Sequence, residues 1–90
     1  MARAVRRTAQ FKRDYRLMKR RGRGMEKLRF VMLKLADEKP LETKYRDHPL
    51  RGNYVGRREC HIEPDWLLIY ILEPGFVVFE RTGTHSDLFK

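Results

Sequence analysis

The stretch HIEPDWLLIYILEPGFVVFERT, residues 61–82, decides the fold. Residues 66–72 are apolar without interruption, which is typical of a central strand buried on both faces. Turn signals flank this strand at residues 63–65 and at residues 73–75, where Pro and Gly are placed as in a type II turn. Residues 57–62 alternate between two faces, and residues 76–82 form the next strand. The stretch therefore predicts a three-stranded antiparallel meander.

The alternation also predicts which side chains share a face of the sheet. In the first meander strand, Glu59 and His61 lie on one face, because strand side chains repeat every second residue. In the last strand, Arg81 shares a face with Val77 and Phe79. Placing Arg81 toward a polar site therefore requires a bulge, or a strand that is buried on both sides for part of its length.

The first half of the chain predicts an edge strand and two helices. Residues 2–7 form the short strand, and Thr8 is the N-cap of a helix that ends at residues 21–24. The second helix begins at Met25 and ends at Lys39-Pro40. The apolar stripes are Phe11, Tyr15 and Met18 in the first helix, and Met25, Leu28, Val31 or Met32, and Leu35 in the second. The predicted class is α+β, with a strand, an antiparallel helical hairpin and a meander. The helices cover one sheet face, so the core does not need the other.

Length and composition limit the possible functions. The 90 residues leave room for a single domain, residues 1–90, and the net charge is +9. Residues 1–34 hold 13 Lys and Arg against 2 Asp and Glu, which favours a polyanionic partner: a nucleic acid, an acidic membrane surface or an acidic protein. The longest apolar run, residues 66–72, is too short to span a bilayer, so no membrane partner is expected. A single cysteine, Cys60, excludes an internal disulfide and fits a reducing, cytoplasmic location.

Histidines are the candidate chemical groups. The three are His48, His61 and His85, and the meander turn brings His61 beside Asp65 and Trp66. They can be ordinary surface histidines, or they can share one site. A zinc site is a rival, but the compact ligand spacings of zinc proteins are absent, so we expect no metal and no cofactor.

A metal-free ribonuclease needs a base for the ribose 2′-OH, an acid for the departing 5′-oxygen, and a cation for the phosphorane. Histidine suits both proton transfers, and the bidentate guanidinium of Arg81 suits the phosphate. Trp66 and Phe89 are candidates to stack on bases, although Trp66 can equally belong to the core.

Three motifs resemble the YafQ toxins of the RelE/ParE superfamily. They are Asp47-His48-Pro49-Leu50 with the glycines that follow, His61-Ile62-Glu63-Pro64-Asp65-Trp66 with its strand, and Phe79-Glu80-Arg81-Thr82-Gly83-Thr84-His85. The resemblance extends from Phe11 to Phe89 and implies a RelE/ParE-like microbial RNase fold. It also implies a toxin of a bacterial type II toxin–antitoxin pair, an endoribonuclease that cuts mRNA in the ribosomal A site without a metal. Attack by the 2′-OH would leave a 2′,3′-cyclic phosphate and a 5′-OH.

The resemblance also assigns site residues. The family's active-site positions fall on His48, His61, Asp65 and His85, with Arg81 and Phe89 beside them. We expect His85 to be the general acid, His48 or Asp65 the base, and His61 and Arg81 the phosphate ligands.

The implied partners are mRNA, the 70S ribosome and a cognate antitoxin. Ribosomal RNA binding is expected at Arg16, Lys19, Arg20, Arg21 and Arg23, although a run of charge can also be only a solvated helix face. The main alternative is a binding-only toxin of the ParE type, which poisons DNA gyrase and needs no nucleolytic residues. An inactive RNA-binding module and a ribosome-independent RNase are further alternatives.

Overall fold

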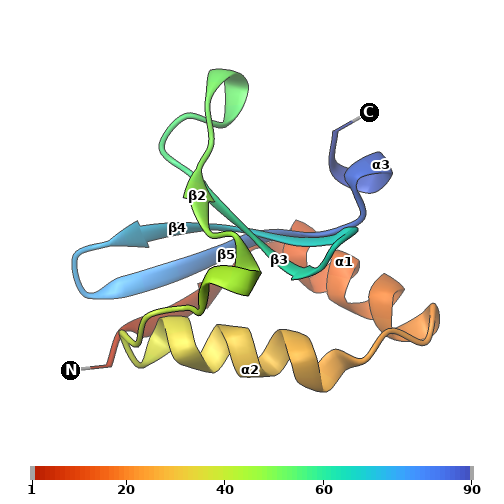
Figure 1. The fold of residues 1–90 in the computed structure, drawn as a ribbon, viewed down its shortest axis with the longest axis horizontal. Coiled ribbons are helices and arrows are strands. Elements are labelled where there is room, and N and C mark those ends of the chain that lie inside the picture. The colour runs from red at the N-terminus through yellow and green to blue at the C-terminus, as the bar shows by residue number, and fades with distance from the viewer. Residues whose placement is uncertain (1, 90) are drawn as a thin grey trace.

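The computed structural model describes residues 2–89 and forms a five-stranded sheet with two long helices on one face (Figure 1). The helices are α1 (Ala9–Arg20), α2 (Met25–Ala36) and α3 (His85–Leu88). The strands are β1 (Ala4–Arg7), β2 (His48–Pro49), β3 (Arg58–Glu63), β4 (Trp66–Glu73) and β5 (Phe76–Gly83). Two 3-10 turns, η1 (Thr43–Tyr45) and η2 (Gly52–Tyr54), lie between α2 and β3. The predicted α+β class is confirmed.

The strand order is β1-β5-β4-β3-β2. Strands β3, β4 and β5 form the predicted antiparallel meander, and β1 is an edge strand that pairs parallel to β5. Two short elements differ from the prediction. Residues 48 and 49, expected in a loop, pair antiparallel with β3 as β2, and the segment after β5 forms the single turn α3.

The two long helices begin where the sequence indicates. The Thr8 hydroxyl accepts a hydrogen bond from the Phe11 amide at 2.9 Å, which caps α1. Helix α2 ends at Ala36, a few residues before the predicted stop. The predicted stripes face the sheet: Phe11, Met18, Met25, Leu28, Val31 and Leu35 are buried, and Tyr15 is partly buried against them.

The opposite face of the sheet also carries a small core, although the prediction was that the core would not need this face. Leu67 and Ile69 of β4 pack there against Leu88 of α3, with Leu50 and Tyr54 beside them. The loop that contains η2 and the C-terminal segment both lie on this face (Figure 1). Strand β4 is therefore buried on both sides, as its unbroken apolar run predicted.

A β-bulge interrupts the alternation that would place Arg81 on the same face as Val77 and Phe79. Arg81 pairs with Ile69, whereas Phe79 pairs with the next residue of β4, Tyr70, so Glu80 is the extra residue. Phe79 and Tyr70 belong to the helix-side core, and Ile69 belongs to the opposite face. The bulge therefore moves Arg81 to the face that lacks the long helices.

Candidate active site

The three histidines gather at one end of the sheet, on the face away from α1 and α2. His48 comes from β2, His61 from β3, and His85 is the first residue of α3. The ring centroids of His48 and His61 are 6.4 Å apart, and those of His61 and His85 are 5.8 Å apart. The predicted sharing of one site by all three rings is therefore present in the structure.

Asp65, in the β3–β4 turn, orients His85. Its Oδ1 accepts hydrogen bonds from the His85 amide at 3.0 Å and from Nδ1 of the ring at 2.6 Å. These two bonds, the amide first, lower the pKa of Asp65 below its ordinary value. The carboxylate therefore stays ionised, and the proton on Nδ1 leaves Nε2 of His85 free for chemistry.

Glu59 is a site residue that was not singled out from the sequence. Its side chain is only 8% exposed, and its carboxylate lies 3.4 Å from Nε2 of His61 and 3.8 Å from Nε2 of His48. The available signal was the alternation that placed Glu59 and His61 on one face. What could not be foreseen was β2, which brings His48 directly opposite Glu59 in the sheet register.

Backbone carbonyls hold the other nitrogen of these two rings. Nδ1 of His48 lies 3.1 Å from the Pro49 carbonyl, and Nδ1 of His61 lies 3.3 Å from the Pro64 carbonyl. A carbonyl oxygen only accepts hydrogen bonds, so each Nδ1 must carry the proton. In the neutral rings, both Nε2 lone pairs then face Glu59.

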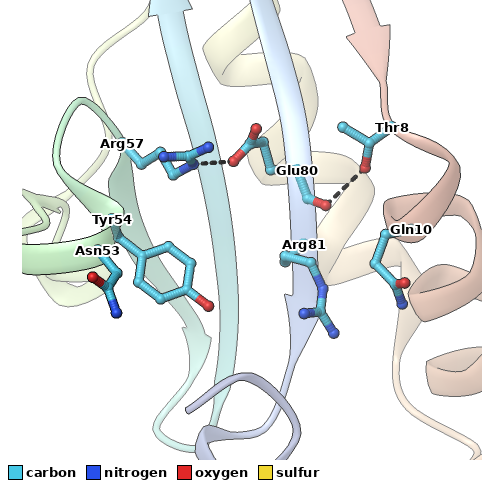
Figure 2. A pocket seen from close by; sticks show the side chains of 7 residues that line it. All are labelled: Thr8, Gln10, Asn53, Tyr54, Arg57, Glu80 and Arg81. Carbon is cyan, nitrogen blue, oxygen red and sulfur yellow. Dashed lines mark hydrogen bonds and ion pairs between the residues drawn. The ribbon is translucent and has the colours of Figure 1, made fainter.

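Arg81 is held by α1 rather than by the histidines. Its Nε and Nη2 donate to Asp14 at 2.8 and 3.3 Å, and the hydrogen bond raises the pKa of the guanidinium further. Arg81 lines a pocket of about 470 Å3 together with Tyr54, Arg57 and Glu80 (Figure 2). The last two form an ion pair across the pocket, and the structure places no histidine among the residues that line it.

Tyr54 and Phe89 connect this pocket to the histidines. The Tyr54 ring packs edge-on against Phe89 at 5.4 Å, and Phe89 lies 6.4 Å from His85. Phe89 is 41% exposed, so its ring is available to a ligand. The pocket and the histidine cluster are therefore joined by aromatic contacts.

Trp66 does not belong to the exposed site. The side chain is completely buried in the helix-side core, and its indole N–H donates to the Thr82 hydroxyl at 2.9 Å. That hydroxyl donates in turn to the Leu67 carbonyl at 2.7 Å. The expectation that Trp66 stacks on bases is corrected on this ground, because neither ring face is accessible.

The predicted basic surface divides into two groups. Arg16, Lys19 and Arg20 are exposed along α1. Arg21 instead makes a bidentate ion pair with Asp87 of α3, at 2.8 and 3.3 Å. Arg23 pairs with Glu63 at 3.1 Å. These two arginines tie the α1–α2 turn to the strand and helix that carry His61 and His85.

Cys60 lies in the helix-side core and is completely buried. Burial raises the pKa of its thiol, so it stays protonated and unreactive.

One side-chain group in the described chain has the geometry to hold a metal ion. His48, Glu59 and His61 each offer one ligand atom, and these atoms all lie within 4.8 Å of one another. The spacing argument that predicted no metal considers only ligands close in sequence, and it does not detect a set assembled across β2 and β3. The structure thus presents a small α+β domain with a histidine-rich site on one sheet face.

Comparison with known proteins identifies the family. Residues 3–90 match the family model described as "Bacterial toxin of type II toxin-antitoxin system, YafQ". The chain belongs to this family of toxins.

Individual relatives agree with this assignment. The "mRNA interferase toxin YafQ" of Escherichia coli (strain K12) is 45% identical over 83 residues, covering 91% of this chain and 90% of that protein. The toxin in a crystal structure of the E. coli DinJ-YafQ complex superposes with a TM-score of 0.92 at 43% identity, covering 98% of this chain and 99% of that one. A metal-bound toxin from Helicobacter pylori superposes with a TM-score of 0.90 at 36% identity, covering 99% and 100%.

Within residues 2–89, no helix has the length and apolar character needed to cross a membrane.

Proposed function

We propose that this toxin is a ribosome-dependent endoribonuclease that cleaves mRNA without a metal cofactor. The observation that carries the proposal is the histidine cluster, in which His48, His61 and His85 share one sheet face and a carboxylate orients the last of them. A relative 45% identical is an mRNA interferase, which supports the substrate class.

The proposed reaction needs two proton transfers. His48 takes the proton from a ribose 2′-OH, and the 2′-oxygen attacks the adjacent phosphorus. The bond from phosphorus to the 5′-oxygen then breaks, and His85 donates a proton to that oxygen. The products are a 2′,3′-cyclic phosphate and a 5′-OH. General acid and base groups of this kind each contribute about 10²- to 10⁴-fold to a rate.

The choice of His48 over Asp65 as base follows from their contacts. Asp65 is already committed to two hydrogen bonds from His85, which lower its pKa and make it a poor proton acceptor. His48 is 48% exposed, and its Nδ1 is held by a carbonyl, so Nε2 can accept a proton. Asp65 is then a positioning residue that acts through His85.

His61 and Arg81 are proposed to bind the phosphate. Arg81 spends only part of its donor set on Asp14, and the remaining N–H groups can face a ligand in the pocket of Figure 2. Phe89 offers a ring on which a base can stack. Stacking of one base on an aromatic side chain contributes about 1–3 kcal/mol in other proteins that bind single-stranded nucleic acid.

Ribosome dependence is proposed from the basic surface of α1. Arg16, Lys19 and Arg20 are exposed, in a half-chain with a large excess of positive charge. Such a surface binds RNA phosphates with little sequence preference. The ribosome would thereby position the message, which a site whose proposed base and acid, His48 and His85, are about half exposed does not do well alone.

A cognate antitoxin is the proposed protein partner. A relative with a TM-score of 0.92 is found in the E. coli DinJ-YafQ complex. The basic surface of this chain can receive an acidic segment of such a partner.

The test is a primer-extension map of messages after brief induction of the toxin. Three proteins are compared: wild type, His85→Ala, and Ser86→Ala, whose exposed side chain lies on the same short helix. Each is induced with translation running and with translation blocked. We expect in-frame cuts that require both translation and His85, and that persist in Ser86→Ala.

Other outcomes separate the alternatives. Cuts at the wild-type rate in folded His85→Ala would contradict the proposed general acid. Cuts that continue when translation is blocked would identify a ribosome-independent RNase. Growth arrest with intact messages and halted replication would instead identify a binding-only toxin directed at DNA gyrase.

A further inference from the structure

We propose that His48, Glu59 and His61 form a transition-metal site, and that a bound ion switches off RNA cleavage. Metal binding itself follows from the geometry of the three side chains. Only the inhibitory consequence rests on the proposed nuclease function. In this proposal the ion is a regulatory ligand and takes no part in the reaction.

The ligand atoms are close to coordination distance. In a tetrahedral zinc site with bonds of about 2.0–2.2 Å, neighbouring ligand atoms lie about 3.3–3.6 Å apart. Nε2 of His61 is 3.4 Å from Glu59, and Nε2 of His48 is 3.8 Å from it. His48 is half exposed on a strand of only 2 residues, so a small side-chain rotation completes the set.

The surroundings prepare both rings for an ion. In metal sites, a ligating histidine commonly donates its other N–H to a carbonyl or carboxylate, which fixes the tautomer. Here Nδ1 of His48 and of His61 face the Pro49 and Pro64 carbonyls. In the neutral rings, two nitrogen lone pairs thus meet a nearly buried carboxylate. These groups repel one another unless a cation lies between them.

The donor set selects the class of ion. Two imidazole nitrogens and one carboxylate suit Zn²⁺, Cu²⁺ or Ni²⁺, whereas Mg²⁺ and Ca²⁺ prefer oxygen ligands alone. His48 leaves one side of the set open to solvent, so water can fill the remaining positions and a chelator can reach the ion. Cys60 is buried in the core on the other side of the sheet and does not contribute.

The consequence for cleavage follows from the atoms involved. The proposed base and one proposed phosphate ligand both act through Nε2, which is also the nitrogen that would bind the ion. A metal-bound imidazole nitrogen has no lone pair left to accept a proton. Occupation of the site is therefore incompatible with the proposed reaction.

The binding test uses tag-free protein stripped with a chelator. ZnCl₂ is titrated by calorimetry, and CoCl₂ is followed by its visible absorption. We expect one ion per chain in the wild type and more than tenfold weaker binding in His48→Gln and Glu59→Gln. His85→Gln is the matched control, because it removes a neighbouring imidazole that lies outside the ligand set. It should bind as the wild type does.

Circular dichroism is used to check that each variant is folded, and His48→Gln changes only an exposed side chain. Absence of binding in the wild type, or equal affinity in folded His48→Gln, would overturn the site. MgCl₂ at equal concentration should neither compete nor bind.

The functional test measures cleavage by ribosome–toxin mixtures during the same ZnCl₂ titration. We expect activity to fall with the midpoint found by calorimetry and to return when chelator is added. Unchanged cleavage at full occupancy would overturn the inhibitory switch. If the chelated wild type cleaves nothing, the nuclease proposal fails, while the binding result stands independently.

Discussion

Replacement of Asp14 by alanine tests how helix α1 is joined to the site strand. Asp14 is 6% exposed, and its carboxylate accepts a hydrogen bond from the Thr82 amide at 3.2 Å, besides the two from Arg81. Gln10 donates to it at 3.0 Å. Asp14 therefore closes the β5 edge beyond the end of β1 and holds Arg81 at the same time.

The expected loss of stability can be worked out from these contacts. An unsatisfied buried amide, here that of Thr82, costs about 1–3 kcal/mol. Breaking a fully buried ion pair costs about 3–5 kcal/mol. Arg81 is 28% exposed and can be hydrated, so the cost of breaking its pair lies below that range. We expect Asp14→Ala to lower the free energy of unfolding by about 2–4 kcal/mol, or the Tm by about 10–25 °C.

Urea unfolding followed by circular dichroism measures this difference. Glu42→Ala is the matched control, because it removes the same charge from an exposed position without a side-chain capping bond. A double-mutant cycle with Arg81→Met should give a double variant less destabilised than the sum of the singles, by about 1 kcal/mol. If Asp14→Ala unfolds within about 0.5 kcal/mol of the wild type, the carboxylate does not hold the strand edge.

Three further predictions concern the site and its supports. Asp65→Asn should lower the single-turnover cleavage rate by about 10²-fold, since His85 loses its charged partner; an unchanged rate would remove the positioning role. Trp66→Phe should cost about 1 kcal/mol in urea unfolding through the lost indole hydrogen bond, and more through the space that the smaller ring leaves in the core, yet leave cleavage within about twofold of the wild type, because the ring is buried. A large loss of cleavage at wild-type stability would restore a stacking role. Asp87 has its pKa lowered to about 2, first by the hydrogen bond from Arg21. The folded protein holds the pKa of Asp87 below its value in the unfolded chain, so the ionised carboxylate stabilises the folded state fully at pH values above the unfolded-state pKa. This stabilisation, about 1 kcal/mol after solvent screening, is lost as pH falls from about 4 toward 2. Unfolding curves over this range should therefore depend less on pH in Asp87→Asn, and parallel curves would contradict the assignment.

The sequence predicted the parts of the fold that local patterns determine. The meander follows from an apolar run between two turns, and both helices follow from their apolar stripes and the Thr8 cap. The bulge before Arg81 was also foreseen as one of two possibilities, because strand alternation is strict and the sequence breaks it. These features depend on neighbours within a few residues, so a single sequence contains them.

Contacts between residues far apart in sequence could not be predicted from the same local patterns. Asp14 looks like a polar residue on a helix, yet it lies three residues after Phe11 and four before Met18, on the buried stripe. Glu59 needed β2 to become part of the site, and a strand of 2 residues has no detectable period. The prediction for Trp66 erred in the opposite way, since it offered a core residue as part of the site. An aromatic residue beside a site motif is indistinguishable in sequence from a core residue.

The position of His85 depends on tertiary contacts, because the short helix that carries it is held in place by other parts of the fold. Helix α3 has only 4 residues, and a single turn of helix is not stable by itself in water. Thr84 and Asp87 close it with a capping box, and Leu88 anchors it on β4. Gly83 permits this fold-back, since a Cβ there would meet Asp87 at 3.0 Å.

Asp87 has a second partner that links this short helix to the opposite half of the chain. The same carboxylate that caps α3 accepts both hydrogen bonds from Arg21 in the α1–α2 turn. Tyr54 adds a further tie by donating to the Leu88 carbonyl at 3.3 Å. The proposed general acid is therefore positioned by residues more than 30 positions away in sequence. The motif Thr82-Gly83-Thr84-His85 gives the identity of that acid but not its location, which is a property of the folded domain as a whole.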